Sequence, residues 1–180
     1  GTIMIINSSG VRTEAFAEPR LKKCRFEAIY VSHPASIVDG EEVADFRIRA
    51  GRKLEELFPV DADVVTGIPD SGNFYAMGFG ESGRSGAFFP AILRNHYVGR
   101  TFIAATQALR DDEVSQKFTF MASSIKGKRV VILDDSIVRG TTLIHVGQVL
   151  RRLGALEVHG RIGCPPFTHP CIYGINTKSR

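Results

Sequence analysis

The sequence lacks the features that mark membrane-spanning, secreted and disulfide-bonded proteins. No apolar run is longer than a handful of residues, as at residues 130–133, so none could cross a bilayer as a helix. Residues 1–7 contain neither a basic segment nor an apolar stretch as long as a secretory signal needs. Three widely spaced cysteines, Cys24, Cys164 and Cys171, form no CxxC pair and no even-numbered disulfide framework. We therefore expect a cytoplasmic protein with no membrane partner.

Dense clusters of one charge are also missing. The chain has 23 Lys and Arg against 19 Asp and Glu, a net charge of +4, and the basic residues are scattered among the acids. Without a basic cluster or a helix-turn-helix pattern, the sequence favours no nucleic-acid partner. A small anionic substrate accounts for the positive balance equally well. With 180 residues, 43% of them hydrophobic, the chain is long and apolar enough for one folded domain with a core.

What the sequence does contain is an alternation of strand and helix patterns. Short apolar runs rich in β-branched residues predict strands at residues 62–68, 87–93, 130–133 and 156–162. A helix is predicted to begin near Asn73. Apolar residues at helical spacing predict another helix over residues 143–153, and Gly154 is placed to end it. Strands that alternate with helices predict an α/β fold, with a mostly parallel sheet flanked by helices.

The N-terminal part predicts three more elements. Residues 2–6 and 11–16 flank a short polar turn and predict an N-terminal β-hairpin, and residues 25–31 alternate as in a strand. Residues 41–58 carry an apolar stripe at helical spacing, which Pro59 terminates and Asp39 is placed to cap.

The strongest motif is VVILDDSIVRGTT at residues 130–142. A buried strand runs into two carboxylates, Asp134 and Asp135, then into a loop of hydroxyls with a glycine, and then into a helix. In α/β folds the carboxyl end of a parallel strand is where ligands bind. The free N–H groups of a helix N-terminus suit a phosphate, and Gly140 allows it to approach closely.

The same motif also suits a sugar and a metal ion. Carboxylates accept hydrogen bonds from sugar hydroxyls and hold Mg²⁺ directly or through water. A sugar phosphate would therefore satisfy both halves of the motif. The alternative is a strand-end turn with two solvated acids, which the buried strand and the Gly-Thr-Thr sequence make less favourable. A GxGxxG match at residues 78–83 follows a predicted helix rather than a strand, so we interpret it as a helix end.

Residues 130–142 resemble the phosphoribosyl pyrophosphate (PRPP) signature of type I phosphoribosyltransferases. The segment DDSIVRGTT is similar in particular to the corresponding segment of the glutamine PRPP amidotransferase family. Four more segments resemble that family in the same order: CRFEAIY at residues 24–30, IPDSG at 68–72, NHYVGRTFI at 95–103 and HPCIYGI at 169–175. The resemblance covers nearly the whole chain and implies the type I phosphoribosyltransferase fold.

The resemblance implies a role for each matching residue. The acid pair would bind the ribose hydroxyls and Mg²⁺, and the 5-phosphate would lie in the loop formed by Ser136, Ile137, Val138, Arg139, Gly140, Thr141 and Thr142. Asp70, Ser71 and Gly72 match the pyrophosphate loop, where Ser71 is associated with the metal. Tyr97 and Arg100 lie in a segment that closes over PRPP, and we assign them to catalysis.

The implied reaction is displacement of pyrophosphate from ribose C1 by ammonia, which gives 5-phosphoribosylamine in the first step of de novo purine synthesis. Because the transition state is a cationic sugar, the protein must stabilise the departing pyrophosphate and exclude water rather than supply a nucleophile. The family further implies purine nucleotides as ligands and a homo-oligomer.

Three features depart from the family pattern. Ammonia comes from a glutaminase domain that this chain is too short to contain, so we expect residues 1–20 to be a hairpin connecting to that domain. Residues 21–180 would then be a C-terminally truncated phosphoribosyltransferase domain. Residues 111–113 are acidic, whereas some members of the family have basic residues in this segment. Cys24 and Cys171 match two of the four ligands of an iron-sulfur cluster that one branch of the family carries, so a complete cluster requires the intact protein.

Two other functions remain open from the sequence. The chain could be a non-catalytic PRPP-binding regulatory module, or a salvage phosphoribosyltransferase that acts on a nucleobase. The segments at residues 24–30 and 95–103 are not expected in base-salvage enzymes and favour the amidotransferase.

Overall fold

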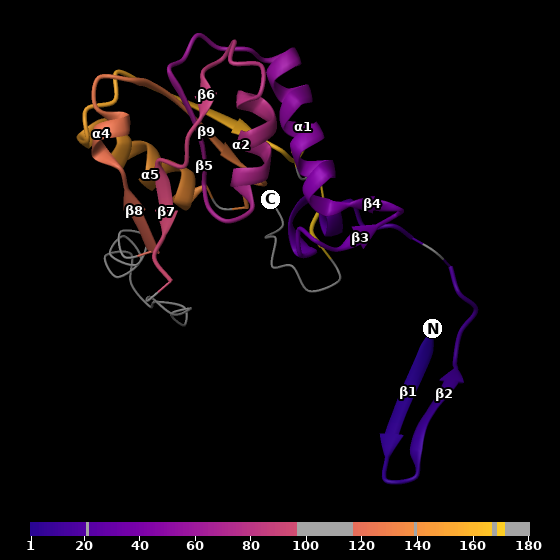
Figure 1. Ribbon diagram of the computed structural model, residues 1–180. Coiled ribbons are helices and arrows are strands. Elements are labelled where there is room, and N and C mark those ends of the chain that lie inside the picture. The colour runs from indigo at the N-terminus through magenta and orange to yellow at the C-terminus, as the bar shows by residue number, and fades with distance from the viewer. Residues whose placement is uncertain (21, 97–116, 139, 167–168, 172–180) are drawn as a thin grey trace.

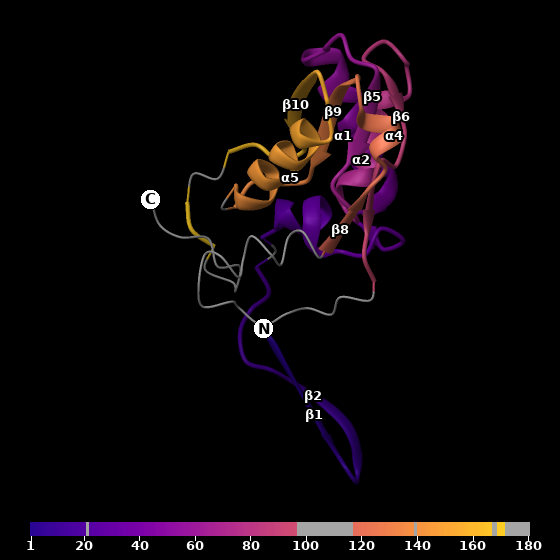
Figure 2. The ribbon, with the colours of Figure 1, turned by 90° about the vertical axis from the view of Figure 1, so that its left-hand side faces the viewer.

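A computed structural model describes residues 1–20, 22–96, 117–138, 140–166 and 169–171. Its centre is a four-stranded sheet in the order β10-β9-β5-β6, in which every neighbouring pair is parallel. The strands are β5 (Val64–Gly67), β6 (Ala87–Phe88), β9 (Arg129–Asp134) and β10 (Glu157–Ile162). Helices cover both faces of the sheet (Figures 1 and 2), so the predicted α/β architecture is confirmed.

Strand β9 separates two hydrophobic clusters. Val130 and Ile132 face one cluster, together with Val146 and Leu150 of helix α5 (Thr141–Arg152). Val131 and Leu133 face the other cluster, which includes residues of α2 (Gly72–Gly80). All four strand residues are at most 2% exposed. A strand that is buried on both faces is continuously apolar, which is why residues 130–133 give so clear a signal in the sequence.

Helix α1 (Val43–Leu57) packs on α2 through a pair of glycines. A Cβ on Gly51 would lie 2.0 Å from the carbonyl oxygen of Tyr75, and a Cβ on Gly78 would lie 1.9 Å from that of Ile48. The two helices therefore touch backbone to backbone. This contact fixes where α2 lies and hence where the loop before it lies.

The predicted strand at residues 25–31 is wrong. Residues Glu27–Val31 form a short π-helix, η1, in which the rings of Phe26 and Tyr30, one turn apart, lie 5.5 Å from each other. Its carbonyl groups accept hydrogen bonds from buried side chains of α1 and α2, which are far away in the sequence. The alternating pattern could not reveal these donors.

Asp39 is not a helix cap. With φ of 55° it forms, with Gly40, the two-residue turn between β3 (Ile37–Val38) and β4 (Glu41–Glu42). Aspartate followed by glycine is a favoured pair for such a hairpin turn. Helix α1 begins at Val43, and no side chain caps it.

The predicted strand at residues 87–93 is divided in two. β6 belongs to the central sheet, whereas β7 (Ile92–Arg94) pairs antiparallel with β8 (Phe118–Phe120), which leads to the one-turn helix α4 (Ala122–Ile125). Pro90 lies between the two strands and has no N–H to donate to a ladder. The other predicted helices and strands are confirmed, and Gly154 (φ 90°) follows the end of α5.

The predicted N-terminal hairpin is confirmed as β1 (Thr2–Asn7) and β2 (Gly10–Ala15). It projects away from the sheet and its helices (Figure 1). Met4, Ile6 and Val11 are each more than 60% exposed, although their register places them on one face of the hairpin. An isolated two-stranded hairpin is marginally stable in water, so this apolar face is available for a partner.

No helix among the described residues is both long and apolar enough to span a membrane.

The glycine contact between α1 and α2 leads to a stability prediction. Gly78→Ala places a methyl group against the backbone of α1, so we expect a loss of about 3 kcal/mol in the free energy of unfolding, measured by urea denaturation. Gly147→Ala is the matched control, because no atom lies within 4 Å of its added Cβ in α5. Alanine there should raise stability by about 0.5 kcal/mol. Equal effects of the two substitutions would contradict the contact.

An ion pair between a buried carboxylate and an exposed arginine gives a second prediction. Glu55 is 4% exposed and accepts two hydrogen bonds of 2.7 Å from Arg84 and one from Ser85. Arg84 lowers the pKa of Glu55. The ion pair therefore stabilises the fold above the ordinary carboxyl pKa of about 4.3, and this contribution is lost as the pH falls through the lowered value.

Glu55→Gln should accordingly cost about 1–2 kcal/mol at pH 7, measured by denaturation, and less as the pH approaches 3. The control is Glu56→Gln, which breaks an exposed pair with Lys53 and should have little effect. A cost for Glu55→Gln that does not depend on pH would refute the assignment.

Candidate functional site

Two loops meet at the carboxyl ends of the central strands. One follows β5 and contains Asp70 and Ser71. The other follows β9, which ends at Asp134, and begins with Asp135. β5 and β9 are parallel neighbours in the sheet. Their carboxyl ends, and the polar residues that follow them, therefore lie side by side at one edge of the sheet.

Gly72 brings the two loops into contact. A Cβ on this residue would lie 2.4 Å from the carbonyl oxygen of Leu133, at the end of β9. The N–H of Ile68 donates to the same oxygen at 2.8 Å. Any larger residue would push the start of α2 away from the acid pair.

Asp135 joins the two loops through hydrogen bonds. Its carboxylate accepts from the Ser71 hydroxyl on one oxygen and from the Ser136 hydroxyl on the other, and the residue is only 4% exposed. Ser71 belongs to the loop after β5 and Ser136 to the loop after β9. The carboxylate is thus the bridge between them.

Asp134 lies in a different environment. Its carboxylate accepts a 2.9 Å hydrogen bond from the N–H of Asp135, and its carbonyl accepts one of the same length from the N–H of Gly163. Burial, together with the neighbouring charge of Asp135, raises the pKa of Asp134 to about 7. Among the described residues, no cation forms a salt bridge with either acid, so a bound cation would stabilise their charged forms.

The start of α5 forms the other half of the site. Gly140 is the residue before the helix, and its φ of 76° is a conformation that glycine adopts readily. Thr141 and Thr142 form the first turn, where backbone N–H groups have no partner within the helix. Val138 is 46% exposed, and Arg139 lies outside the described residues.

Sequence analysis missed two residues at this site. Arg94, at the end of β7, forms an ion pair with Asp70 and so adds positive charge beside the loop after β5. Cys164 follows β10, and burial together with the charge of Asp135 raises the pKa of its thiol. Neither residue belongs to the motif. β7 pairs with β8 outside the central sheet and β10 is a different strand from β9, so only the tertiary fold brings them to the site.

Some of the predicted site residues lie outside the part of the chain that the structure describes, namely Tyr97, Arg100 and the acids at residues 111–113. Cys24 is exposed and Cys171 is partly buried. Among the residues that the structure describes, no group of three or more His, Cys, Asp and Glu side chains is placed to hold a metal ion.

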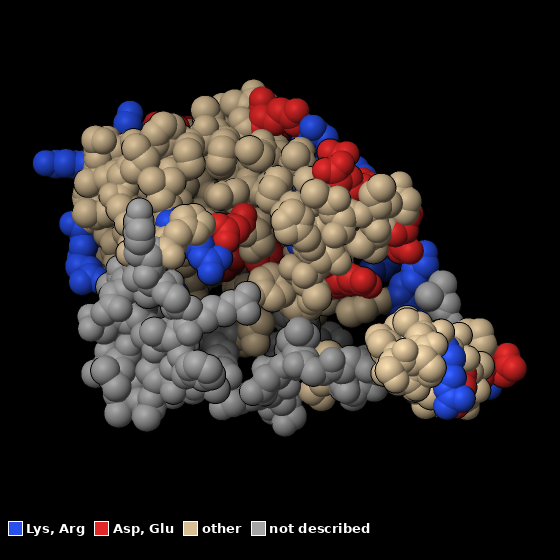
Figure 3. Space-filling view, turned by 60° about the horizontal axis from the view of Figure 1, so that its bottom comes forward, with Lys and Arg blue, Asp and Glu red and all other residues tan. Residues whose placement is uncertain are grey.

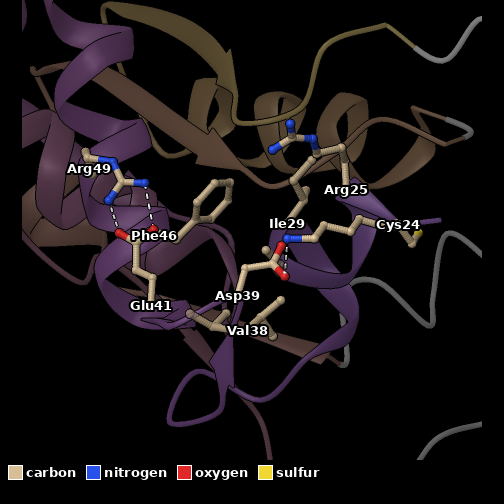
Figure 4. Close-up of a pocket in the computed structure, with 11 residues that line it drawn as sticks. Cys24, Arg25, Ile29, Val38, Asp39, Glu41, Phe46 and Arg49 are labelled. Atoms are coloured by element: carbon tan, nitrogen blue, oxygen red, sulfur yellow. Dashed lines mark hydrogen bonds and ion pairs between the residues drawn. The ribbon is translucent and has the colours of Figure 1, made fainter. Parts of the chain in front are cut away.

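A separate small cavity of about 160 Å³ lies between η1, the β3–β4 hairpin and α1 (Figure 4). Ile29 and Val43 line it, and two ion pairs border it: Lys23 with Asp39 at 2.7 Å, and Arg49 with Glu41. None of the residues that line this cavity belongs to the two loops beside the acid pair.

One face of the molecule carries charges of both signs. In the space-filling view, basic and acidic side chains are interspersed over the part of this face that the structure describes (Figure 3).

Comparison with known proteins shows what this chain is similar to. A family model described as a phosphoribosyl transferase domain matches residues 83–162, a range that includes β9, the acid pair and α5. Amidophosphoribosyltransferases from Synechocystis and Bacillus subtilis are 45% and 44% identical to this chain, over 100% and 99% of its length. The chain covers 36% and 38% of those two proteins, so it spans little more than a third of their length.

Two solved structures are similar to this chain as well. Glutamine PRPP amidotransferase from B. subtilis, solved with ADP and GMP, matches 99% of the chain at a TM-score of 0.80 and 43% identity. The chain covers 39% of that structure. A second structure, described as the allosteric regulatory enzyme of purine biosynthesis, gives the same TM-score and identity. Over its whole length the chain is similar to a part of the amidophosphoribosyltransferases. The type I phosphoribosyltransferase fold that the sequence predicts for this family is therefore confirmed.

Proposed function

We propose that this chain is the phosphoribosyltransferase part of an amidophosphoribosyltransferase. It would convert PRPP and ammonia to 5-phosphoribosylamine and pyrophosphate, as the first step of purine synthesis. The observation that carries the proposal is the bridge from Ser71 through Asp135 to Ser136, beside the start of α5. This bridge puts a phosphate-binding helix start, two carboxylates and a second loop within one site.

Each part of PRPP has a matching group in the site. The 5-phosphate would bind the N–H groups at the start of α5 and the hydroxyls of Ser136, Thr141 and Thr142. The ribose hydroxyls would donate to the acid pair. The pyrophosphate would lie against residues 70–72, with Arg94 close by to balance its charge.

The donor set fits Mg²⁺, which prefers one or two carboxylates together with substrate phosphates. Asp134, Asp135 and Ser71 supply hard oxygen ligands, and burial together with the charge of Asp135 raises the pKa of Asp134, so a bound cation would favour its charged form. When bound, the metal would offset the negative charge that develops on the departing pyrophosphate.

The protein groups would act by positioning and by excluding water. Asp135 holds both loops in place, and the positive end of α5 fixes the 5-phosphate, so that ribose C1 keeps one orientation toward ammonia. We propose that Tyr97 and Arg100 complete the enclosure. No protein nucleophile is required for a displacement through a cationic sugar.

We also propose a domain arrangement. Residues 1–20 would connect to a glutaminase domain of the same parent chain, which would cover the exposed apolar face of the hairpin. Residues 21–180 would form the transferase part. Cys24 and Cys171 would serve as iron-sulfur ligands only in an intact protein that supplies two more, and no step of the proposed reaction depends on that cluster.

Further expectations concern ligands, assembly and location. Purine nucleotides carry the same 5-phosphate and ribose as PRPP, so the acid pair and the start of α5 should bind them as well. The B. subtilis relative was solved with ADP and GMP. We propose a homo-oligomeric, cytoplasmic protein.

The acid pair is tested by charge removal. Asp135→Asn or Asp134→Asn should weaken Mg²⁺-dependent PRPP binding by about tenfold to a hundredfold, measured by titration calorimetry with Mg²⁺ and again with a chelator. Asp61→Asn is the matched control, since Asp61 is 85% exposed and pairs with Arg129 at the opposite end of β9. Unchanged affinity in both acid-pair variants would refute the site.

The domain proposal is tested by the choice of amino donor. Incubated with Mg²⁺ and PRPP, the purified chain should release pyrophosphate when ammonia is added but not when glutamine is added. A coupled pyrophosphate assay and a glutamate assay measure the two outcomes. Release of glutamate by the chain alone would show that the glutaminase activity needs no further domain.

A further inference from the structure

Tyr75 is buried at the back of the acid pair, and the proposed reaction does not use it. It lies in α2, four residues after Ser71. Ser71 directly precedes the helix and has helical φ and ψ, so the two residues lie on the same side of the first turn. Ser71 bonds to Asp135, and the Tyr75 ring lies against Gly163. Helix α2 therefore approaches the acid pair from two points that are one turn apart.

The contact with Gly163 is tight. A Cβ on Gly163 would lie 2.3 Å from Cε1 of Tyr75, and 2.7 Å from Cδ1 and Cζ of the same ring. The N–H of Gly163 donates to the carbonyl of Asp134 at 2.9 Å. The ring thus packs on the residue whose backbone holds Asp134.

The other end of the Tyr75 side chain is also fixed. Its hydroxyl donates to the carbonyl of Ile29 in η1 at 3.1 Å, and the residue is fully buried. Burial raises the pKa of Tyr75, so the hydroxyl remains a donor at physiological pH. Arg47 of α1, itself 1% exposed, donates to the carbonyls of Ala28 and Ser32 on either side.

We propose that Tyr75 is a positioning residue, whose ring, packed on Gly163, sets where Asp134 lies relative to Ser71. The inference rests on the proposed function, because its consequence is the affinity for PRPP and Mg²⁺. A displacement of about 1 Å in such a site costs up to about a hundredfold in activity. The ring contributes this effect, whereas the hydroxyl holds η1 against the helices.

The test compares Tyr75→Phe with Tyr75→Leu. Mg²⁺-dependent PRPP binding is measured by calorimetry at a temperature where circular dichroism shows each variant folded. Tyr75→Phe keeps the ring and should bind within about twofold of the unchanged chain. Tyr75→Leu removes two of the three ring atoms that lie nearest Gly163 and should bind at least about tenfold more weakly. Equal affinity of the Leu variant and the unchanged chain, or equal losses in both variants, would overturn the inference.

Gly163→Ala approaches the same contact from the other side. In the unchanged chain it should weaken PRPP binding. In the Tyr75→Leu variant the same substitution should cause a much smaller further loss of affinity, because the ring that the new methyl group would displace is already absent. Gly160→Ala, in β10 and three residues before Gly163, is the control, since its added Cβ meets only ordinary contacts at 3.8 Å and 4.0 Å with Leu143. Independent, additive losses from Gly163→Ala and Tyr75→Leu would contradict the positioning role.

The unchanged chain separates the two hypotheses. If it binds PRPP with Mg²⁺ and the Leu variant binds equally well, only the positioning role is wrong. If it does not bind PRPP at all, the proposed function is wrong and the positioning role fails with it.

Discussion

The carboxylate of Asp135 is the interaction on which the site depends. It accepts one hydroxyl from the loop after β5 and one from the loop after β9, and it lies almost entirely out of contact with water. A buried carboxylate without such donors would be costly, so the two serines and the acid stabilise one another. Because each serine is anchored in a different loop, the same hydrogen bonds define the distance between the two halves of the proposed PRPP site.

The framework behind that carboxylate is rigid. β9 lies between two hydrophobic clusters and ends at the acid pair, while α2 is pressed against α1 by contacts that only glycine permits. Gly72 brings the start of α2 against the end of β9. Displacement of any of these elements would alter the spacing of Ser71 and Asp135. The packing of these helices and strands therefore also determines the geometry of the site.

The sequence predicted those parts of the site that are continuous along the chain. The buried run at residues 130–133, the acid pair and the glycine before α5 are adjacent in sequence, so their chemistry could be inferred without a structure. The contributions of Arg94 and Cys164 could not be inferred, because only the tertiary fold brings the end of β7 and the end of β10 to the site. The roles of Tyr97 and Arg100 remain predictions.

The sequence by itself determined the α/β class, most of the strands and helices, and the family. These features depend on residues that are close together in the sequence, so the pattern of apolar residues and the local motifs are sufficient to predict them. The tertiary structure decided the conformation of residues 25–31, where an alternating pattern favoured a strand. Arg47 and Tyr75, which lie far along the chain, donate to the carbonyls of a π-helix instead. It also decided that Asp135 bridges two loops, because a hydrogen bond across 64 positions of the chain exists only once the sheet has formed.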